Sequence, residues 1–196
     1  MAEASPQIRL FVACELPDEV LNALGQLQDG LGRAGAEQLR WVRPEGIHLT
    51  LKFLGEVEVA LVDDVTASLS ACIQPFALRL SASRLGAFGG RRLRVVWVGL
   101  DGQTGELSDL AKTVERALEP LGFQAERRPF APHLTLARVR ERASAAERER
   151  LSGLLESYQM PSPTEFSLSR VALIQSILGP GGARYRTISR FPSTSS

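Results

Sequence analysis

Apolar positions along the chain alternate between strand-like and helix-like spacing, and the rhythm of the first half recurs in the second. Residues 8–15 form a short apolar run that predicts a strand, after which Val20, Leu24 and Leu27 follow the three- and four-residue steps of a helix. Residues 86–91 are expected to form a loop. The same pattern predicts further strands over 47–54, 76–82, 93–100, 133–140, 165–171, 172–178 and 184–191, further helices over 58–73, 104–121 and 144–158, and an extended piece at 123–130.

Length and composition agree with one folded unit. The chain has 196 residues, of which 44% are hydrophobic and 23% are charged, and no linker-like shift in composition divides it. These values exclude long disordered, collagen-like and disulfide-rich classes. We therefore expect one α+β domain over residues 1–196, built from two similar lobes, with residues 193–196 as a frayed tail.

Charge and cysteine content narrow the classes of function. A net charge of +1 argues against a protein that coats nucleic acid non-specifically. Of the 23 basic residues 21 are arginines, which suit flat contacts with phosphate, although a GC-rich genome produces the same bias. Cys14 and Cys72 match neither a zinc site nor a disulfide framework, and no signal-peptide pattern or long apolar run is present. We expect a cytoplasmic protein without a membrane segment.

One tetrapeptide occurs twice and contains both histidines of the chain. His48 begins the sequence His-Leu-Thr-Leu, and His133 begins an identical copy 85 residues later. In a strand, His48 and Thr50 share one face, as do His133 and Thr135, while the leucines face the opposite side. Two such faces across a groove would form a general acid–base pair of imidazoles, with the threonines donating to anionic oxygens. This pair predicts a bell-shaped dependence of rate on pH.

Two other interpretations of the histidines are less favourable. A single strand histidine is more often a satisfied core or surface group, but the identical pair is hard to assign to chance. A zinc site would need more ligands, and neither tetrapeptide contains a cysteine or a carboxylate. We therefore expect no metal at these residues.

The duplicated motif resembles that of the 2H phosphoesterase superfamily, in particular its RNA 2′,3′-cyclic phosphodiesterase or 2′-5′ RNA ligase branch. The resemblance covers nearly the whole chain. Residues that carry it are Phe11–Val12–Ala13, residues 41–45 (WVRPE), residues 51–55 (LKFLG), the Phe88 loop before residues 95–99 (VVWVG), Pro132, Ala137–Arg138, and the ending from Ser176 through Tyr185 to Phe191.

This resemblance implies a bilobal α+β fold with two antiparallel sheets around a central cleft. It implies hydrolysis of RNA-terminal 2′,3′-cyclic phosphate to 2′-phosphate without metal or cofactor, and in some members reversible 2′-5′ ligation. His48 and His133 would be the catalytic pair, Thr50 and Thr135 would hold the phosphate, and Arg138 would be an additional phosphate clamp. Which histidine is the acid stays open because the repeat is nearly symmetric.

Other candidate site residues follow from position along the strands. Strict alternation places Arg138 on the face opposite His133, so a bulge or the strand end would have to re-aim it. Alternation places Lys52 on the same face as His48, where it would add positive charge to the cleft. The candidates for stacking on bases are Phe53, Phe88, Phe130 and Tyr185.

The partners we expect are RNA ends or nucleotides with a 2′,3′-cyclic phosphate, bound by a monomer. An alternative enzyme would use the same site on small cyclic nucleotides or an ADP-ribose cyclic phosphate. A different class is a nucleotide-binding module without turnover. The presence of both complete motifs argues against that class, because losing one imidazole would be enough to abolish catalysis.

Overall fold

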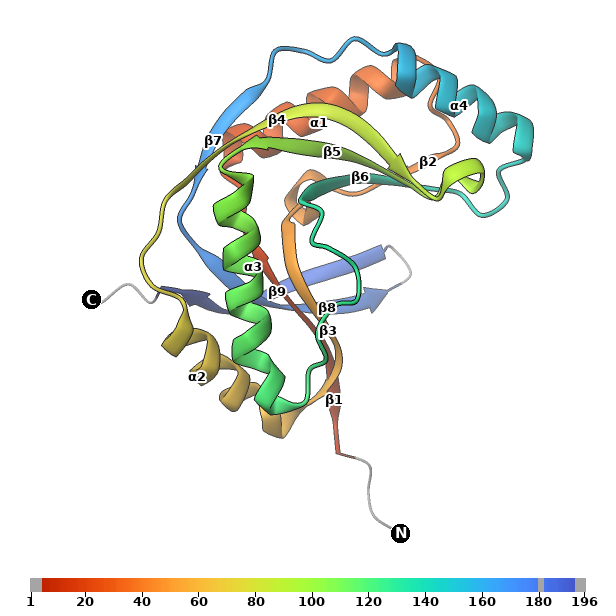
Figure 1. Ribbon diagram of the computed structural model, residues 1–196. Coiled ribbons are helices and arrows are strands. Elements are labelled where there is room, and N and C mark those ends of the chain that lie inside the picture. Colours follow the sequence, from red (N-terminus) through yellow and green to blue (C-terminus); the bar gives the residue numbers. More distant parts are fainter. Residues whose placement is uncertain (1–4, 180–181, 193–196) are drawn as a thin grey trace.

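The chain folds into two antiparallel sheets with helices on their outer sides (Figure 1). The computed structural model describes residues 5–179 and 182–192, so Pro180, Gly181 and the expected tail at 193–196 lie outside the described residues. The strands are β1 (Gln7–Cys14), β2 (Leu39–Trp41), β3 (Leu49–Glu58), β4 (Leu78–Phe88), β5 (Val95–Gly102), β6 (His133–Val139), β7 (Thr164–Leu168), β8 (Val171–Gly179) and β9 (Gly182–Phe191). The helices are α1 (Asp18–Arg33), α2 (Val62–Cys72), α3 (Thr104–Leu118) and α4 (Ala145–Ser157).

The two tetrapeptides belong to different sheets. The four-stranded sheet has the order β3-β1-β8-β9, and the five-stranded sheet has the order β2-β6-β5-β4-β7. Helices α1 and α4 lie over the outer side of the five-stranded sheet, whereas α2 and α3 pack near the four-stranded one (Figure 1). The inner faces are therefore turned toward each other, with His48 next to β3 and His133 at the start of β6. This architecture confirms the α+β class with two antiparallel sheets.

From Leu10 to Cys14, strand β1 is buried on both faces, because apolar residues pack against each side of the sheet there. Leu10 and Val12 join the main core, whereas Phe11 and Ala13 form a second apolar cluster with residues of β8. A strand covered on both sides gives a continuous apolar run instead of an alternating one. The second cluster lies on the inner face of the sheet, beneath His48, since the Phe11 ring stacks against the imidazole.

Two predicted segments differ from the structure. Residues 86–88 continue β4 instead of opening a loop, and Gly86 pairs with Trp97 of β5. A Cβ at Gly86 would overlap the Trp97 ring, so this glycine permits a close contact rather than a turn. The extended piece expected at 123–130 is not a strand, and most of these residues are exposed. The other predicted strands and helices are present with shifted ends.

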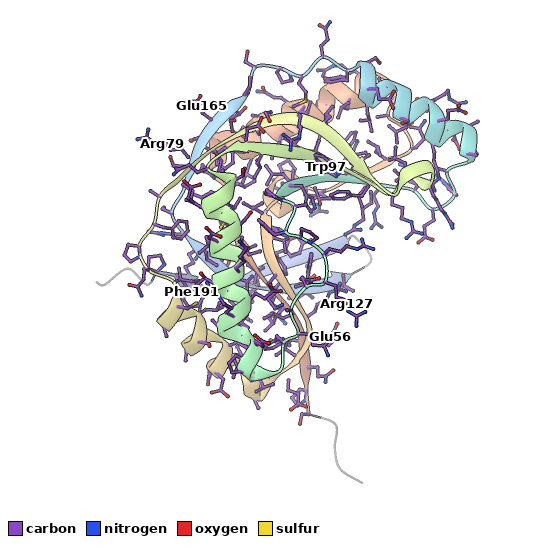
Figure 2. The ribbon with its side chains drawn as sticks, viewed as in Figure 1. Glu56, Arg79, Trp97, Arg127, Glu165 and Phe191 are labelled. Carbon is purple, nitrogen blue, oxygen red and sulfur yellow. The ribbon has the colours of Figure 1, made fainter. Side chains whose placement is uncertain are left out.

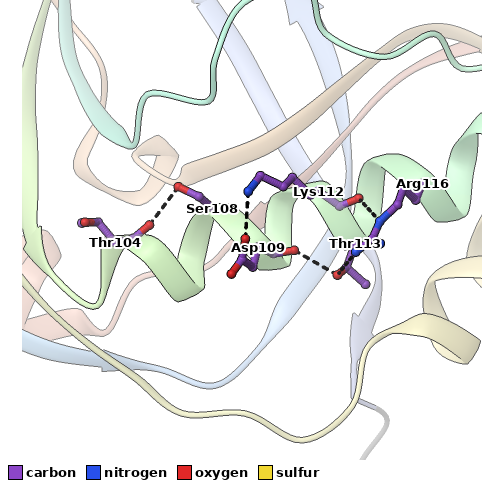
Figure 3. Close-up of polar contacts among 6 residues, drawn as sticks. All are labelled: Thr104, Ser108, Asp109, Lys112, Thr113 and Arg116. Carbon is purple, nitrogen blue, oxygen red and sulfur yellow. Dashed lines mark hydrogen bonds and ion pairs between the residues drawn. The ribbon is translucent and has the colours of Figure 1, made fainter.

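The packing of helix α3 matches the amphipathic pattern that predicts it. Leu107, Val114 and Leu118 are buried, while its exposed side is held by local contacts between side chains and backbone (Figure 3). Asp109 accepts a hydrogen bond from Lys112 Nζ at 2.9 Å, and its carbonyl accepts one from Thr113 Oγ1 at 2.9 Å (Figure 3). Within the described ranges, no helix has the length and hydropathy of a membrane span.

Candidate active site

A β-bulge in β6 turns Arg138 toward the same face as His133 and Thr135. In the pairing with β5, Ala137 lies opposite Val96, but the next residue of β5 lies opposite Thr135. One residue of β6, Leu136, is therefore unopposed, and the side-chain alternation is reset beyond it. Leu136 and Ala137 are both buried, and Arg138 is exposed and lines a cavity with His133 and Thr135. The bulge resolves the conflict between alternation and the expected position of Arg138.

Strand β3 contains the same irregularity at the equivalent place, and it corrects the prediction for Lys52. Val12 of β1 lies opposite Lys52, but Ala13 lies opposite Thr50, so Leu51 is the extra residue. Beyond this bulge Lys52 turns to the buried side, with 3% of its surface exposed. Phe53 takes the place on the inner face and lines the cavity. Lys52 therefore does not contribute charge to the cavity wall.

Lys52 instead connects β3 to the segment that leads into the second motif. Its Nζ donates to the carbonyl of Gln124 at 2.7 Å and to Glu115 Oε1 of α3 at 3.3 Å. The same carboxylate oxygen accepts the backbone N–H of Glu126. A buried ammonium needs such partners, because an unpaired charge in the interior is costly. The contacts fix the start of the loop that ends at His133.

We predict that Lys52→Met destabilises the fold, since it leaves the Glu115 carboxylate and the Gln124 carbonyl without their buried donor. The free energy of unfolding should fall by about 3 kcal/mol, measured by urea denaturation. Lys112→Met on the exposed side of α3 is the matched control and should leave stability nearly unchanged, because its partner Asp109 is also exposed. Equal midpoints for the two variants would contradict the role given to Lys52.

Both tetrapeptides line one cavity between the sheets. Its volume is about 510 Å³, and His48, Thr50, His133 and Thr135 all contribute to its wall. Arg138 joins them, together with Arg9 of β1 and Arg40 of β2. Among the described lining residues there is no aspartate or glutamate, so the wall is strongly positive. Such a cavity favours an anionic ligand that accepts hydrogen bonds, such as a phosphate. Within the described ranges, no cluster of three His, Cys, Asp or Glu side chains could hold a metal ion.

His48 is held by two aromatic rings. Phe11 stacks on the imidazole with 4.5 Å between ring centroids, and the edge contact with Tyr185 has a centroid separation of 5.0 Å. Burial lowers the pKa of His48 to about 4, and a hydrogen bond with the backbone of Gly46 acts in the opposite direction. The neutral imidazole is therefore the form present at pH 7. An anion bound beside it would raise the pKa of His48, because it favours the charged form.

His133 is held in a comparable way on the opposite sheet. Its Nδ1 lies 2.7 Å from the carbonyl of Ala131, which can only accept, so Nδ1 carries a proton. Nε2 is then the nitrogen left to exchange a proton with a ligand. Phe88 makes an edge contact with the ring at a centroid separation of 4.9 Å, and Trp97 makes another at 6.3 Å. The rings limit the orientation of the imidazole, as acid–base chemistry requires.

The four aromatic candidates for base stacking separate into two groups. Phe53, with 60% of its surface exposed, and Tyr185 line the cavity and offer ring surface to a ligand. Phe88 is not among the residues that line the cavity, but 39% of its surface is exposed and its ring contacts both Trp97 and His133. Phe130 packs against the main core. Phe53 and Tyr185 therefore lie on the cavity wall itself, and Phe88 is exposed beside His133.

Several residues at the site were not predicted to have a role there. Phe11 supports His48, Trp97 supports His133, and Arg9 and Arg40 add charge to the wall. Phe11 lies in an apolar run that does not reveal which face it occupies. Arg40 reaches the site only because β2 pairs with β6, a contact between residues far apart in sequence. A local pattern contains no signal for such pairings.

Comparison with known proteins identifies the family. The family model of the 2′-5′ RNA ligase superfamily matches residues 16–179. A protein of Aeropyrum pernix named RNA 2′,3′-cyclic phosphodiesterase is 34% identical over 90% of this chain and 98% of its own, and one of Methanocaldococcus jannaschii with the same name is 30% identical over 92% and 98%. The crystal structure of E. coli LigT complexed with 3′-AMP matches with a TM-score of 0.76 and 25% identity, covering 97% of this chain and 100% of LigT. The chain therefore belongs to the 2′-5′ RNA ligase superfamily, the branch of the 2H phosphoesterases that its repeated tetrapeptide resembles.

Proposed function

We propose that this protein is an RNA 2′,3′-cyclic phosphodiesterase that opens the cyclic phosphate to a 2′-phosphate without a metal ion. One observation carries the proposal: two His-x-Thr faces from different sheets line a single cavity that contains three arginines and, among its described residues, no carboxylate. Relatives of this chain are named for this activity, and LigT binds a nucleotide in its complex with 3′-AMP.

In the proposed reaction, water attacks the phosphorus in line with the 3′ oxygen. One imidazole removes a proton from the water, the bond from phosphorus to the 3′ oxygen breaks, and the other imidazole protonates that oxygen. The non-bridging phosphoryl oxygens accept hydrogen bonds from Thr50, Thr135 and Arg138 as the transition state forms. A 5′-hydroxyl of a second RNA in place of water would give a 2′-5′ phosphodiester, so ligation would use the same groups and no ATP.

The substrate in this proposal is a nucleotide at an RNA end. The base would stack against Phe53 or Tyr185, whose rings are exposed at the cavity wall. The positive wall would neutralise the phosphate and hold the end of the chain. A monomeric state and a cytoplasmic location stay predictions from the sequence.

The function is tested with an oligoribonucleotide ending in 2′,3′-cyclic phosphate, incubated with the protein in excess chelator. The product should be the 2′-phosphate alone, identified by its chromatographic mobility against both phosphate isomers, and chelator should not change the rate. Loss of activity in chelator that is restored by a divalent cation would contradict the metal-independent mechanism. A 3′-phosphate product would contradict the proposed direction of ring opening.

The same assay separates the alternatives. Faster turnover of a mononucleotide 2′,3′-cyclic phosphate or of an ADP-ribose cyclic phosphate than of the oligonucleotide would favour a small-molecule enzyme. Binding of these ligands without any turnover would favour a nucleotide-binding module. Both outcomes would remove RNA hydrolysis as the function of the cavity.

A further inference from the structure

Two arginines lie directly opposite each other at the edge of the cavity. Arg40 of β2 pairs with Arg138 of β6 in the antiparallel register, and both side chains are exposed. Like charges directly opposite each other destabilise a sheet. In the part of the chain that the structure describes, neither guanidinium forms an ion pair with a carboxylate. The fold therefore holds two positive groups together without a neutralising partner of its own.

A groove adjoins the cavity at these two arginines and shares most of its lining residues with it. The groove has a volume of about 280 Å³ and is lined by Arg40 and Arg138 together with Trp41 and Arg43. Arg40 and Arg138 are the charged residues that line both spaces, and the groove adds Arg43 and Trp41 beyond them. No acidic residue is among the described residues of the groove wall, so its positive charge extends that of the cavity. An anion longer than one phosphate would follow this path.

We propose that Arg40 forms a second phosphate site, which holds the internucleotide phosphate next to the reacting end of a single-stranded RNA. The proposal rests on the proposed function, because it assumes that the cyclic phosphate occupies the His-x-Thr faces. Arg138 is on the same strand as His133 and Thr135 and is turned toward them by the bulge, so it contacts the terminal phosphate. Arg40 is one strand further from β5, on the side where the groove begins. Its planar guanidinium suits the two non-bridging oxygens of a phosphodiester.

This site would give the protein a preference for RNA ends over mononucleotides. A mononucleotide 2′,3′-cyclic phosphate has one phosphorus, whereas any longer RNA presents a second phosphate on the 5′ side of the terminal ribose. A charge-assisted hydrogen bond to that phosphate corresponds to about tenfold in affinity. Arg40 is therefore assigned to substrate selection and not to the chemical step.

The test compares Arg40→Gln with wild type on a pentaribonucleotide ending in 2′,3′-cyclic phosphate and on cytidine 2′,3′-cyclic phosphate. The ratio of kcat/KM for the pentamer to kcat/KM for the mononucleotide should fall about tenfold in the variant. The fall should come from a higher KM for the pentamer. Arg79→Gln is the control and should retain the wild-type ratio, because Arg79 is an exposed residue of β4 that does not line the cavity and lies away from Trp97 (Figure 2). An unchanged ratio in Arg40→Gln, or an equal loss on both substrates, would overturn the second site.

A binding measurement tests the Arg40 site whether or not the proposed hydrolysis occurs. Fluorescence anisotropy of a labelled pentaribonucleotide ending in 2′-phosphate reports affinity whether or not the protein hydrolyses anything. The slope of log affinity against log salt should decrease by about 0.7 in Arg40→Gln, the value for one lost contact to a single strand. An unchanged slope would overturn the Arg40 site even if hydrolysis occurs. A reduced slope without hydrolysis would support the site while the proposed function fails.

Discussion

Alanine in place of either His48 or His133 should lower hydrolysis of an RNA 2′,3′-cyclic phosphate by about 1,000-fold. Each imidazole transfers one proton in the proposed transition state, and general acid–base groups contribute on this scale. The loss should fall mainly on kcat, since the proton transfers take place in the transition state and not in the bound ground state. Single-turnover rates with saturating protein measure this step directly.

Both histidines also have structural contacts, so folding has to be measured beside turnover. His48 packs against Phe11 and Tyr185, and alanine there removes both ring contacts. His48→Asn and His133→Asn retain a polar side chain of smaller size and should be as inactive as the alanine variants, with thermal unfolding close to wild type. Wild-type turnover in either folded variant would rule out a two-histidine mechanism. Inactivity that follows loss of folding in all four variants would assign the histidines to the fold.

The shape of the site could be predicted from the sequence up to the fourth residue of each motif. Period-two alternation puts His48 with Thr50 and His133 with Thr135, and the structure places all four side chains on the wall of one cavity. Alternation fails beyond Leu51 and Leu136, the last residues of the two motifs, because each is the extra residue of a bulge. Bulges depend on how a strand pairs with its neighbour, which the strand's own sequence does not show.

The two failures have opposite consequences. After the bulge in β6, Arg138 joins the cavity, although its parity places it on the other side. After the bulge in β3, Lys52 leaves the cavity and contacts Glu115 and Gln124, although its parity places it inside. The resemblance to a known family predicted Arg138 at the site where periodicity did not, and Arg138 lines the cavity. The resemblance includes Lys52 but assigns it no role, so its expected position followed only from alternation.

Pairings between distant strands account for the rest of what could not be predicted. Gly86 of β4 lies opposite Trp97 of β5, and the Trp97 ring occupies the space that a side chain at Gly86 would need. The sequence pattern predicted a loop at Gly86, but Gly86 is a strand residue. Segment 123–130 contains apolar residues but is held by Lys52 instead of by a neighbouring strand. In both places a tertiary contact determines the local conformation.

The paired bulges also show how the duplicated halves differ. Phe53 and Arg138 occupy the same place in their strands, three residues after the motif threonines, and both line the cavity. The first half therefore supplies an exposed ring at the position where the second supplies a guanidinium. A nucleotide has a part that suits each group, since its base stacks on an aromatic ring and its phosphate accepts hydrogen bonds from a guanidinium. Under the proposed function, the asymmetry at this position would orient a substrate that a fully symmetric cavity could bind in two directions.

Arg138→Gln should therefore lower kcat/KM by about 100-fold, because it removes a charged donor from the phosphoryl oxygens in the transition state. Arg138→Lys should recover part of the loss, since lysine keeps the charge but lacks the planar pair of donors. Arg140→Gln is the matched control, because Arg140 is also exposed but lies beyond the end of β6 and does not line the cavity. Steady-state rates on one cyclic phosphate substrate compare the three variants. Equal rates for Arg138→Gln and Arg140→Gln would show that Arg138, although the bulge turns it into the cavity, does not contribute to hydrolysis.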